Sequence, residues 1–232
     1  MADREVINQD IPTHVAIIMD GNRRWAKSRG LAAKDGHRAG FERFKEIVQL
    51  CFDRGVKYVT VYAFSTENWK RTDEEVGALM GLMTYAVKNE IQNYKKKNIR
   101  VNIIGRRSDL TSALQTDLAE IERETFNKDG NILNVAISYG GKAEILMAAQ
   151  EVFNSDEELT EETIDSHLYT AGQPNPDLLI RTGGQHRLSN FLLWQTDYTE
   201  LYFTDTLWPD FKAGELDKAL GFYTKIKRNF GK

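Results

Sequence analysis

Short apolar runs alternate with longer segments of helical periodicity along almost the whole chain. The runs are rich in β-branched and aromatic residues, which favour strands, and we expect six strands, at residues 14–20, 56–64, 99–105, 132–138, 177–182 and 200–204. Helices are expected at residues 41–55, 74–97, 109–127, from 142 onward, and at 214–229. Nearly continuous apolar strands that alternate with helices predict an α/β fold with a single parallel six-stranded sheet flanked by helices.

Length and composition set the class of protein. The chain has 232 residues, of which 41% are hydrophobic, and we expect residues 1–232 to form a single domain with residues 1–11 as a flexible N-terminal tail. The net charge of −3 argues against nucleic acid as a partner. The first residues lack the apolar core of a signal peptide, and no apolar run is long enough to span a bilayer. We therefore expect a cytoplasmic protein, peripheral to the membrane where it meets one, and the single cysteine, Cys51, fits a reducing compartment.

The stretch DGNRRW follows the first expected strand. In a parallel sheet, ligands bind beyond the carboxyl ends of the strands. Asp20 stands at such an end, Gly21 and Asn22 suit a tight turn into a helix, and Arg23 and Arg24 add charge for phosphate oxygens. The stretch is either an anion site with a carboxylate beside it or an ordinary strand–turn–helix junction with solvated arginines.

Two further polar clusters follow expected strands. RTGGQHRLSN contains Arg181, Arg187 and Ser189, which form either a second cradle for an oxyanion or a plain glycine-rich loop. STENWKR follows the second strand and is either part of the site or a capped loop, since Thr72 or Asp73 suits the N-cap of the next helix.

Two phosphate cradles with a carboxylate between them suggest a diphosphate site, where the carboxylate holds Mg²⁺ on the diphosphate. The sequence lacks the GxxxxGK[ST] and GxGxxG phosphate motifs, and it has no cysteine–histidine set with zinc spacing.

Four stretches together resemble the cis-prenyltransferases: HVAIIMDGNRRWA, YAFSTENWKR, IRTGGQHRLSNFLLWQ and ELYFTDTLWPDF. Within that family the chain is most similar to the bacterial undecaprenyl diphosphate synthases, in order from about residue 12 to 231, and it lacks the DDxxD motif of trans-prenyltransferases, as they do. The resemblance implies an undecaprenyl diphosphate synthase-like fold and a homodimer.

The implied activity is that of a Mg²⁺-dependent prenyltransferase. Such an enzyme adds isopentenyl diphosphate repeatedly to an allylic diphosphate, usually farnesyl diphosphate, to give a long-chain product such as undecaprenyl diphosphate, the precursor of a lipid carrier for cell-wall synthesis. The product then requires transient contact with a membrane for its release. The alternatives are a shorter-chain synthase of the same family, a non-catalytic subunit of a heteromeric prenyltransferase, and a phosphohydrolase that uses the aspartate of MDGN.

The resemblance also implies residue roles. Asp20 and Asn68 are the expected catalytic residues, and the expected metal ligands are Asp20, His186 and Glu200. The allylic diphosphate is expected at Gly21, Asn22, Arg23, Arg24, Trp25, Lys34 and His37. A mobile loop, with Ser65, Thr66, Glu67, Asn68, Trp69 and Arg71, joins this site to the isopentenyl diphosphate site at Arg181, Arg187, Leu188 and Ser189.

The chain departs from the family pattern at three places. Ala32 and Ala33 replace a Pro-Arg pair, so that Lys34 is the nearest substitute for a phosphate-binding arginine. Gln185 stands where many members have glutamate, and Asn229, beside Arg228, takes the place of an arginine whose Arg-x-Gly tail reaches the partner subunit.

The growing product needs an apolar channel. We expect its walls on the helix from Phe41 to Phe52 and on the next helix, at Val76, Leu79, Met80, Leu82 and Met83, although plain core packing is the alternative for most of these residues.

Overall fold

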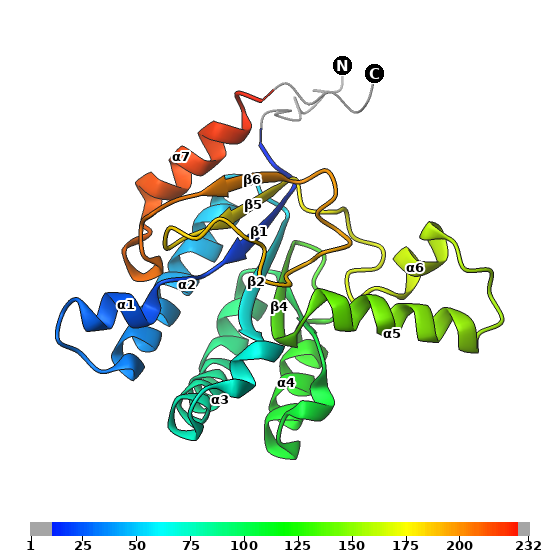
Figure 1. The fold of residues 1–232 in the computed structure, drawn as a ribbon, viewed down its shortest axis with the longest axis horizontal. Helices are drawn as coiled ribbons and strands as arrows, with labels where there is room; N and C mark the ends of the chain where they lie inside the picture. The colour runs from blue at the N-terminus through cyan, green and yellow to red at the C-terminus, as the bar shows by residue number, and fades with distance from the viewer. Residues whose placement is uncertain (1–10, 227–232) are drawn as a thin grey trace.

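The computed structural model describes residues 11–226, in which six strands form one sheet (Figure 1). The strands are β1 (His14–Ile18), β2 (Tyr58–Ser65), β3 (Ile99–Ile104), β4 (Asn131–Tyr139), β5 (Leu178–Arg181) and β6 (Glu200–Phe203). Their order in the sheet is β3-β4-β2-β1-β5-β6, and every neighbouring pair is parallel. The predicted fold class and all six strands are confirmed.

Seven α-helices and three short 3₁₀ helices lie between the strands or after the last one in the described part of the chain. They are α1 (Asn22–Lys27), α2 (Ala33–Asp53), α3 (Asp73–Lys96), α4 (Ser112–Thr125), α5 (Gly141–Asn154), α6 (Glu161–His167) and α7 (Ala213–Tyr223), with η1 (Thr66–Lys70), η2 (Arg107–Asp109) and η3 (Trp208–Asp210). The apolar periodicity missed α6 and the start of α2. The first turns of α2 contain Gly36 and Gly40, which carry no apolar side chain because Asn22 packs directly against them.

The strands bury both faces, as their continuous apolar runs require. In β1, Val15 and Ile17 belong to a core shared with α2, α3, α4 and α7, whereas Ala16 and Ile18 pack on the opposite side with Phe191. Figure 1 shows α5 and α6 lying together, apart from the pair α3 and α4. The sheet is therefore the middle layer of the protein. The polar loops that follow β1 and β5 lie at its carboxyl edge.

The chain ends lie largely outside the described residues. Of the expected tail, residues 1–10 lie outside them, while Ile11 packs against the core and the Thr13 amide donates to Asp177. The expected last helix ends at Tyr223, and Arg228 and Asn229 lie outside the described residues. Between residues 11 and 226, no helix is both long and apolar enough to cross a membrane.

Candidate active site

The ends of β1 and β5 bring a carboxylate and a guanidinium together. Ile18 pairs with Arg181 across the sheet, so Asp20, two residues beyond β1, lies beside the Arg181 side chain. Arg181 Nη2 donates to Asp20 Oδ2 at 3.1 Å, and Arg24 Nη2 donates to Asp20 Oδ1 at 3.1 Å. Both carboxylate oxygens are therefore oriented by arginines from different segments of the chain.

The turn between β1 and α1 places Arg24 for this contact. Gly21 has a φ of 117°, a conformation that favours glycine, and a side chain there would meet Leu207. The turn lets α1 begin at Asn22, so that Arg24 stands one helical turn after Asp20. Arg24 Nη1 also donates to the Gly183 carbonyl at 2.6 Å, which ties the first cradle to the loop after β5.

The loop after β5 folds around Arg181. Arg181 Nη1 donates to the Arg187 carbonyl and to Ser189 Oγ, the latter at 2.7 Å. Arg181 is only 4% exposed, and its Nε is buried without a hydrogen-bond partner among the described residues. A buried donor without a partner costs about 1–3 kcal/mol, so this nitrogen suits a bound anion. Arg187 itself is exposed and donates to Gln185 Oε1 at 2.6 Å.

The segment after β2 connects the two cradles. The Ser65 amide donates to Asn68 Oδ1 at 3.1 Å, which holds the Asn68 side chain against the end of the strand. Glu67 Oε1 accepts from Asn190 Nδ2 at 3.0 Å. Burial raises the pKa of Glu67, but hydrogen bonds from its own amide, Asn190, Ser65 and Thr66 outweigh burial and bring the pKa below its usual value. Glu67 therefore stays ionised and fastens this segment to the loop after β5.

One carboxylate of the site was missed in the sequence. Glu75, in the first turn of α3, accepts from Arg71 Nη1 at 2.8 Å and lies 3.3 Å from His37 Nε2 and 3.6 Å from Arg23 Nη1. Burial lowers the pKa of His37, although Glu75 raises it in part. The signal in the sequence is the i, i+4 spacing of Glu75 from Arg71, a residue that was itself expected in the site.

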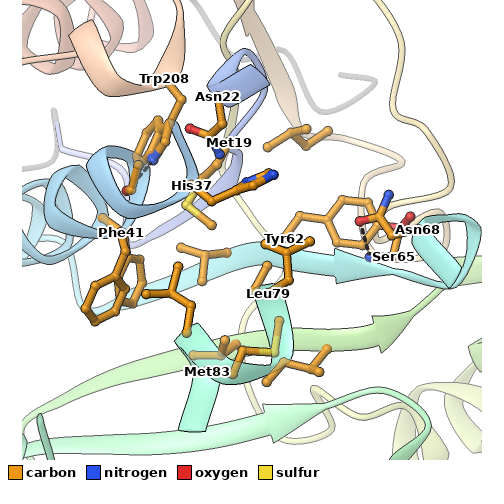
Figure 2. Close-up of a pocket in the computed structure, with 18 of the residues that line it drawn as sticks. Met19, Asn22, His37, Phe41, Tyr62, Ser65, Asn68, Leu79, Met83 and Trp208 are labelled. Atoms are coloured by element: carbon orange, nitrogen blue, oxygen red, sulfur yellow. Dashed lines mark hydrogen bonds between the residues drawn. The ribbon is translucent and has the colours of Figure 1, made fainter. Parts of the chain in front are cut away.

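A large cavity, of about 1080 Å³, opens beside these groups, and residues of the sheet and of the helices α2, α3 and α4 line it. Figure 2 shows part of this lining, with His37, Phe41 and Met83 among the labelled side chains. Its mouth is polar and its depth is apolar. Of the residues expected in the site, thirteen line it: Asp20, Gly21, Asn22, Arg23, Arg24, His37, Ser65, Glu67, Asn68, Arg71, Arg181, Arg187 and Ser189. A volume above the roughly 300–1,000 Å³ of usual ligand pockets leaves room for more than two diphosphate groups.

The apolar walls agree only in part with the expectation. Phe41, Leu79, Leu82 and Met83 line the cavity, whereas Val76 and Met80 do not. Most of the deep wall comes from strands and from α4, at Val61, Val101, Ile103, Leu118, Ile121, Leu133, Val135 and Ile137. In the sequence these positions have the pattern of ordinary core residues, so nothing local distinguishes them.

Seven expected site residues do not line the cavity: Trp25, Lys34, Thr66, Trp69, His186, Leu188 and Glu200. The Trp25 indole donates to Asp210 and is covered by Arg29, whose guanidinium carbon lies 4.3 Å from the ring centre. Lys34 is exposed, and Ala33 lines the cavity where the family has its arginine. Lys27, which was not predicted, also lines it, because the last turn of α1 faces the mouth.

The expected metal set does not come together in one chain. Glu200 begins β6 and pairs with Leu178, which in turn is level with Val15. Asp20 is five residues beyond Val15, so about 16 Å of strand separates the two carboxylates. Glu200 lies at the start of its strand, as expected, whereas Asp20 follows the end of β1. The starts and ends of parallel strands lie at opposite edges of a sheet, so the two carboxylates are far apart. His186 is exposed, and its ring stacks on Phe203 at 4.9 Å.

The donor set at Asp20 fits one kind of metal. Between residues 11 and 226 no group of three or more histidine, cysteine, aspartate or glutamate side chains is arranged to hold an ion. Asp20 is the one carboxylate of the expected metal set at this mouth, and its side chain is 29% exposed. Mg²⁺ is commonly held by one or two carboxylates together with substrate phosphates and waters, so the residues fit an ion that arrives on a diphosphate.

Comparisons with known proteins point to one family. Residues 18–231 match the family model described as putative undecaprenyl diphosphate synthase. The chain is 47% identical to an isoprenyl transferase of Fusobacterium nucleatum, over 97% of this chain and 98% of that protein, and 47% identical to one of Aquifex aeolicus, over 96% of each.

Two solved structures have the same fold. Lavandulyl diphosphate synthase from Lavandula x intermedia, in complex with dimethylallyl diphosphate, is 36% identical, with a TM-score of 0.93 over 97% of this chain and 100% of that one. A probable undecaprenyl diphosphate synthase from Campylobacter jejuni is 32% identical, with a TM-score of 0.82 over 95% and 99% of the two chains.

Proposed function

The chain belongs to the undecaprenyl diphosphate synthase family of prenyltransferases, and from this premise we propose that it adds isopentenyl diphosphate repeatedly to an allylic diphosphate, with farnesyl diphosphate as the starter. The product is a long-chain cis-polyprenyl diphosphate such as undecaprenyl diphosphate, a lipid-carrier precursor for cell-wall synthesis. The observation that carries the proposal is the position of Arg181, whose buried guanidinium joins Asp20 to Ser189 at the mouth of a large apolar cavity.

The first chemical step is cleavage of the allylic C–O bond, which leaves negative charge on the departing diphosphate. Arg23, Arg24 and the amides at the start of α1 stand where that charge develops, so they stabilise the transition state more than the ground state. Asp20 would hold Mg²⁺ on the diphosphate, and the ion would supply further stabilisation of the leaving group.

The second step joins the allylic carbon to the alkene of isopentenyl diphosphate. Arg181, Arg187 and Ser189 bind its diphosphate, while Asn68 and Glu67 hold the two cradles at a constant separation, which favours the bond-forming geometry. A proton then leaves the new carbon chain. The released diphosphate or Asp20 accepts it, because the amide of Asn68 is a poor base and serves for positioning.

The apolar cavity accepts the product as it lengthens. Each added five-carbon unit contributes up to roughly 4 kcal/mol of burial, at about 0.8 kcal/mol per CH₂. A shorter-chain synthase is the alternative, and the similarity to a lavandulyl diphosphate synthase supports it. A non-catalytic subunit is disfavoured because Asp20, Asn22, Arg24, Glu67, Arg181 and Arg187 are all present and line one cavity.

One assay separates these possibilities. Purified protein is mixed with Mg²⁺, farnesyl diphosphate and labelled isopentenyl diphosphate, and the lipid products are sized by chromatography. We expect a ladder that ends at a long product. Products of one or two additions support the shorter-chain synthase, and no extension at all contradicts the proposed enzyme. Omission of Mg²⁺ in the presence of a chelator tests the role of the ion.

The interface of a homodimer is proposed at an exposed apolar patch on α5. On α5, Leu146 and Phe153 are 72% and 78% exposed, and their spacing of two turns places them on one face. Paired apolar side chains of this size favour an interface. Analytical ultracentrifugation tests the proposal: Leu146→Asp with Phe153→Asp gives monomers, whereas Phe126→Asp, at an exposed residue after α4, leaves the dimer intact. A wild type that sediments as a monomer contradicts it.

Product release involves transient contact of a cytoplasmic enzyme with a membrane. A long polyprenyl chain leaves the apolar cavity for an apolar phase rather than for water, which makes release slow. Added detergent or lipid vesicles should therefore raise the steady-state rate while leaving a single-turnover rate unchanged. Equal rates in both conditions, without an initial burst, contradict slow release.

A further inference from the structure

Trp69 is anchored behind the site rather than in it. It belongs to η1 and lies in the chain between Asn68 and Arg71, both of which line the cavity. Its Nε1 donates to Ser138 Oγ at 2.8 Å, and its ring packs edge-on against the buried Phe64, with 4.9 Å between ring centres. The indole thus fastens η1 to the body of the protein on the side away from the cavity.

Ser138 is held in an unusual backbone conformation at the end of β4. Its φ is 47°, in the left-handed region that few residues other than glycine adopt, and its side chain is fully buried. Its carbonyl accepts from the Arg106 amide at 3.1 Å. The hydroxyl is therefore aimed by the backbone, since a serine in the ordinary extended conformation would point elsewhere.

Asp109 completes the chain of contacts. Ser138 Oγ donates to Asp109 Oδ2 at 2.5 Å, and the same oxygen accepts from Arg106 Nε at 3.1 Å. A hydroxyl has one proton, so donation to Asp109 leaves the oxygen lone pairs of Ser138 for the Trp69 indole. Asp109 thereby sets the direction of the hydrogen bond that holds Trp69.

We propose that Ser138 and Asp109 are positioning residues for chain extension, which fix Trp69 and, through it, the separation of the two diphosphate cradles. The inference rests on the proposed function of the site. Glu67, which contacts Asn190 of the loop after β5, and Asn68 both precede Trp69 directly. A displacement of η1 by about 1 Å is enough to lower a rate by up to about a hundredfold.

Substitutions distinguish this role from a merely structural one. Ser138→Ala, Asp109→Ala and Trp69→Phe each break the chain of contacts, and we expect kcat/KM for isopentenyl diphosphate to fall about tenfold, the ratio that corresponds to about 1.4 kcal/mol. The Kd for farnesyl diphosphate alone should stay within about twofold, because Arg23 and Arg24 of the first cradle are held by α1 rather than by η1. Asp109→Asn keeps an acceptor for the Ser138 hydroxyl and should restore most of the activity.

The matched control is Trp194→Phe. Trp194 Nε1 donates to Asp165 at 2.7 Å, the same kind of indole contact, and neither residue lines the cavity. The proposal is overturned if Trp194→Phe lowers kcat/KM as much as Trp69→Phe, or if Ser138→Ala keeps wild-type constants at an unchanged melting temperature.

Failure of the proposed function itself gives a different result. If the wild type extends no substrate, hydrogen–deuterium exchange of residues 66–71 still tests the anchor. Faster exchange of this segment in Ser138→Ala and Asp109→Ala than in the wild type and Trp194→Phe supports the anchor, and equal exchange in all four proteins overturns it.

Discussion

Arg181 Nη2 donates a hydrogen bond to Asp20 Oδ2 at 3.1 Å, although 161 residues separate the two in the chain. The contact exists because β1 and β5 are neighbours in the sheet and end at the same level. It joins the cradle expected for the allylic diphosphate to the cradle expected for isopentenyl diphosphate.

Asp20→Asn should abolish most activity without unfolding the protein. The amide keeps the shape of the side chain but removes the charge that orients both arginines and that we propose to hold the metal, so kcat should fall by about 10²–10³. Steady-state kinetics with labelled isopentenyl diphosphate measures the change. Asp217→Asn, which alters a carboxylate paired with Arg54 outside the cavity, is the control. Full activity of Asp20→Asn contradicts the proposed role.

Arg181→Lys should weaken isopentenyl diphosphate binding. The guanidinium makes contacts to three groups in fixed directions, and an ammonium on a flexible stem cannot reproduce them. We expect KM for isopentenyl diphosphate to rise at least about tenfold, a cost of about 1.4 kcal/mol. Arg54→Lys is the matched control, because Arg54 also contacts a carboxylate and a carbonyl. Equal KM values in the two variants contradict the assignment.

Val135→Phe should shorten the product. Val135 is half-buried at the deep wall of the cavity, so a larger side chain extends into open space and blocks later additions rather than the first one. The product ladder from farnesyl diphosphate should end several units earlier at a similar initial rate. Val76→Phe changes a half-buried valine that does not line the cavity, and its ladder should match the wild type. An unchanged ladder for Val135→Phe places the growing chain elsewhere.

His14 should make the fold less stable in acid. Burial lowers its pKa to about 4 from 6.5, although the hydrogen bond between Nδ1 and the Pro174 carbonyl raises the pKa in part. Nε2 lies 2.7 Å from the Thr60 hydroxyl, which donates to it when the ring is neutral. Below pH 6.5 the unfolded chain binds a proton that the folded chain does not, so stability from His14 is complete above that pH and is lost as the pH falls toward 4.

Between about pH 7.5 and pH 5 the loss should be about 2 kcal/mol. Urea unfolding at the two pH values measures it in the wild type and in His14→Gln, which should lose this part of the dependence. His167→Gln, at a partly exposed histidine, should keep it. An identical pH dependence in wild type and His14→Gln contradicts the argument.

Local patterns were enough to predict the strands and the burial of both of their faces. Val15 to Ile18 form a continuous apolar run because both faces of β1 are covered, and that run is visible without any contact information. Gly21 likewise predicted a tight turn before a helix, and its left-handed φ shows that the turn needs a glycine there. Motif positions such as Asp20, Arg181 and Ser189 could be expected together because parallel strands end at one edge.

Other features have no local signature. Ile137 and Leu118 are the same kinds of residue whether they face a cavity or a packed core, so the periodicity of β4 and α4 cannot distinguish the two. Glu75 resembles an N-terminal helix carboxylate, and only the packing of α3 near His37 makes it part of the site. Trp69 stands in a motif of cavity residues, yet its indole points to Ser138.

The amino-acid order by itself determines the strand-forming runs, their parallel arrangement and the chemistry of the loops after them. This is because hydrophobic periodicity and turn preferences act over a few residues. The distance between Asp20 and Glu200, the volume beneath α3 and the anchor of Trp69 depend on register and packing between segments far apart in the chain. Register sets which strand ends are level, and packing sets where side chains leave space. These two quantities arise only when the sheet and its helices are assembled.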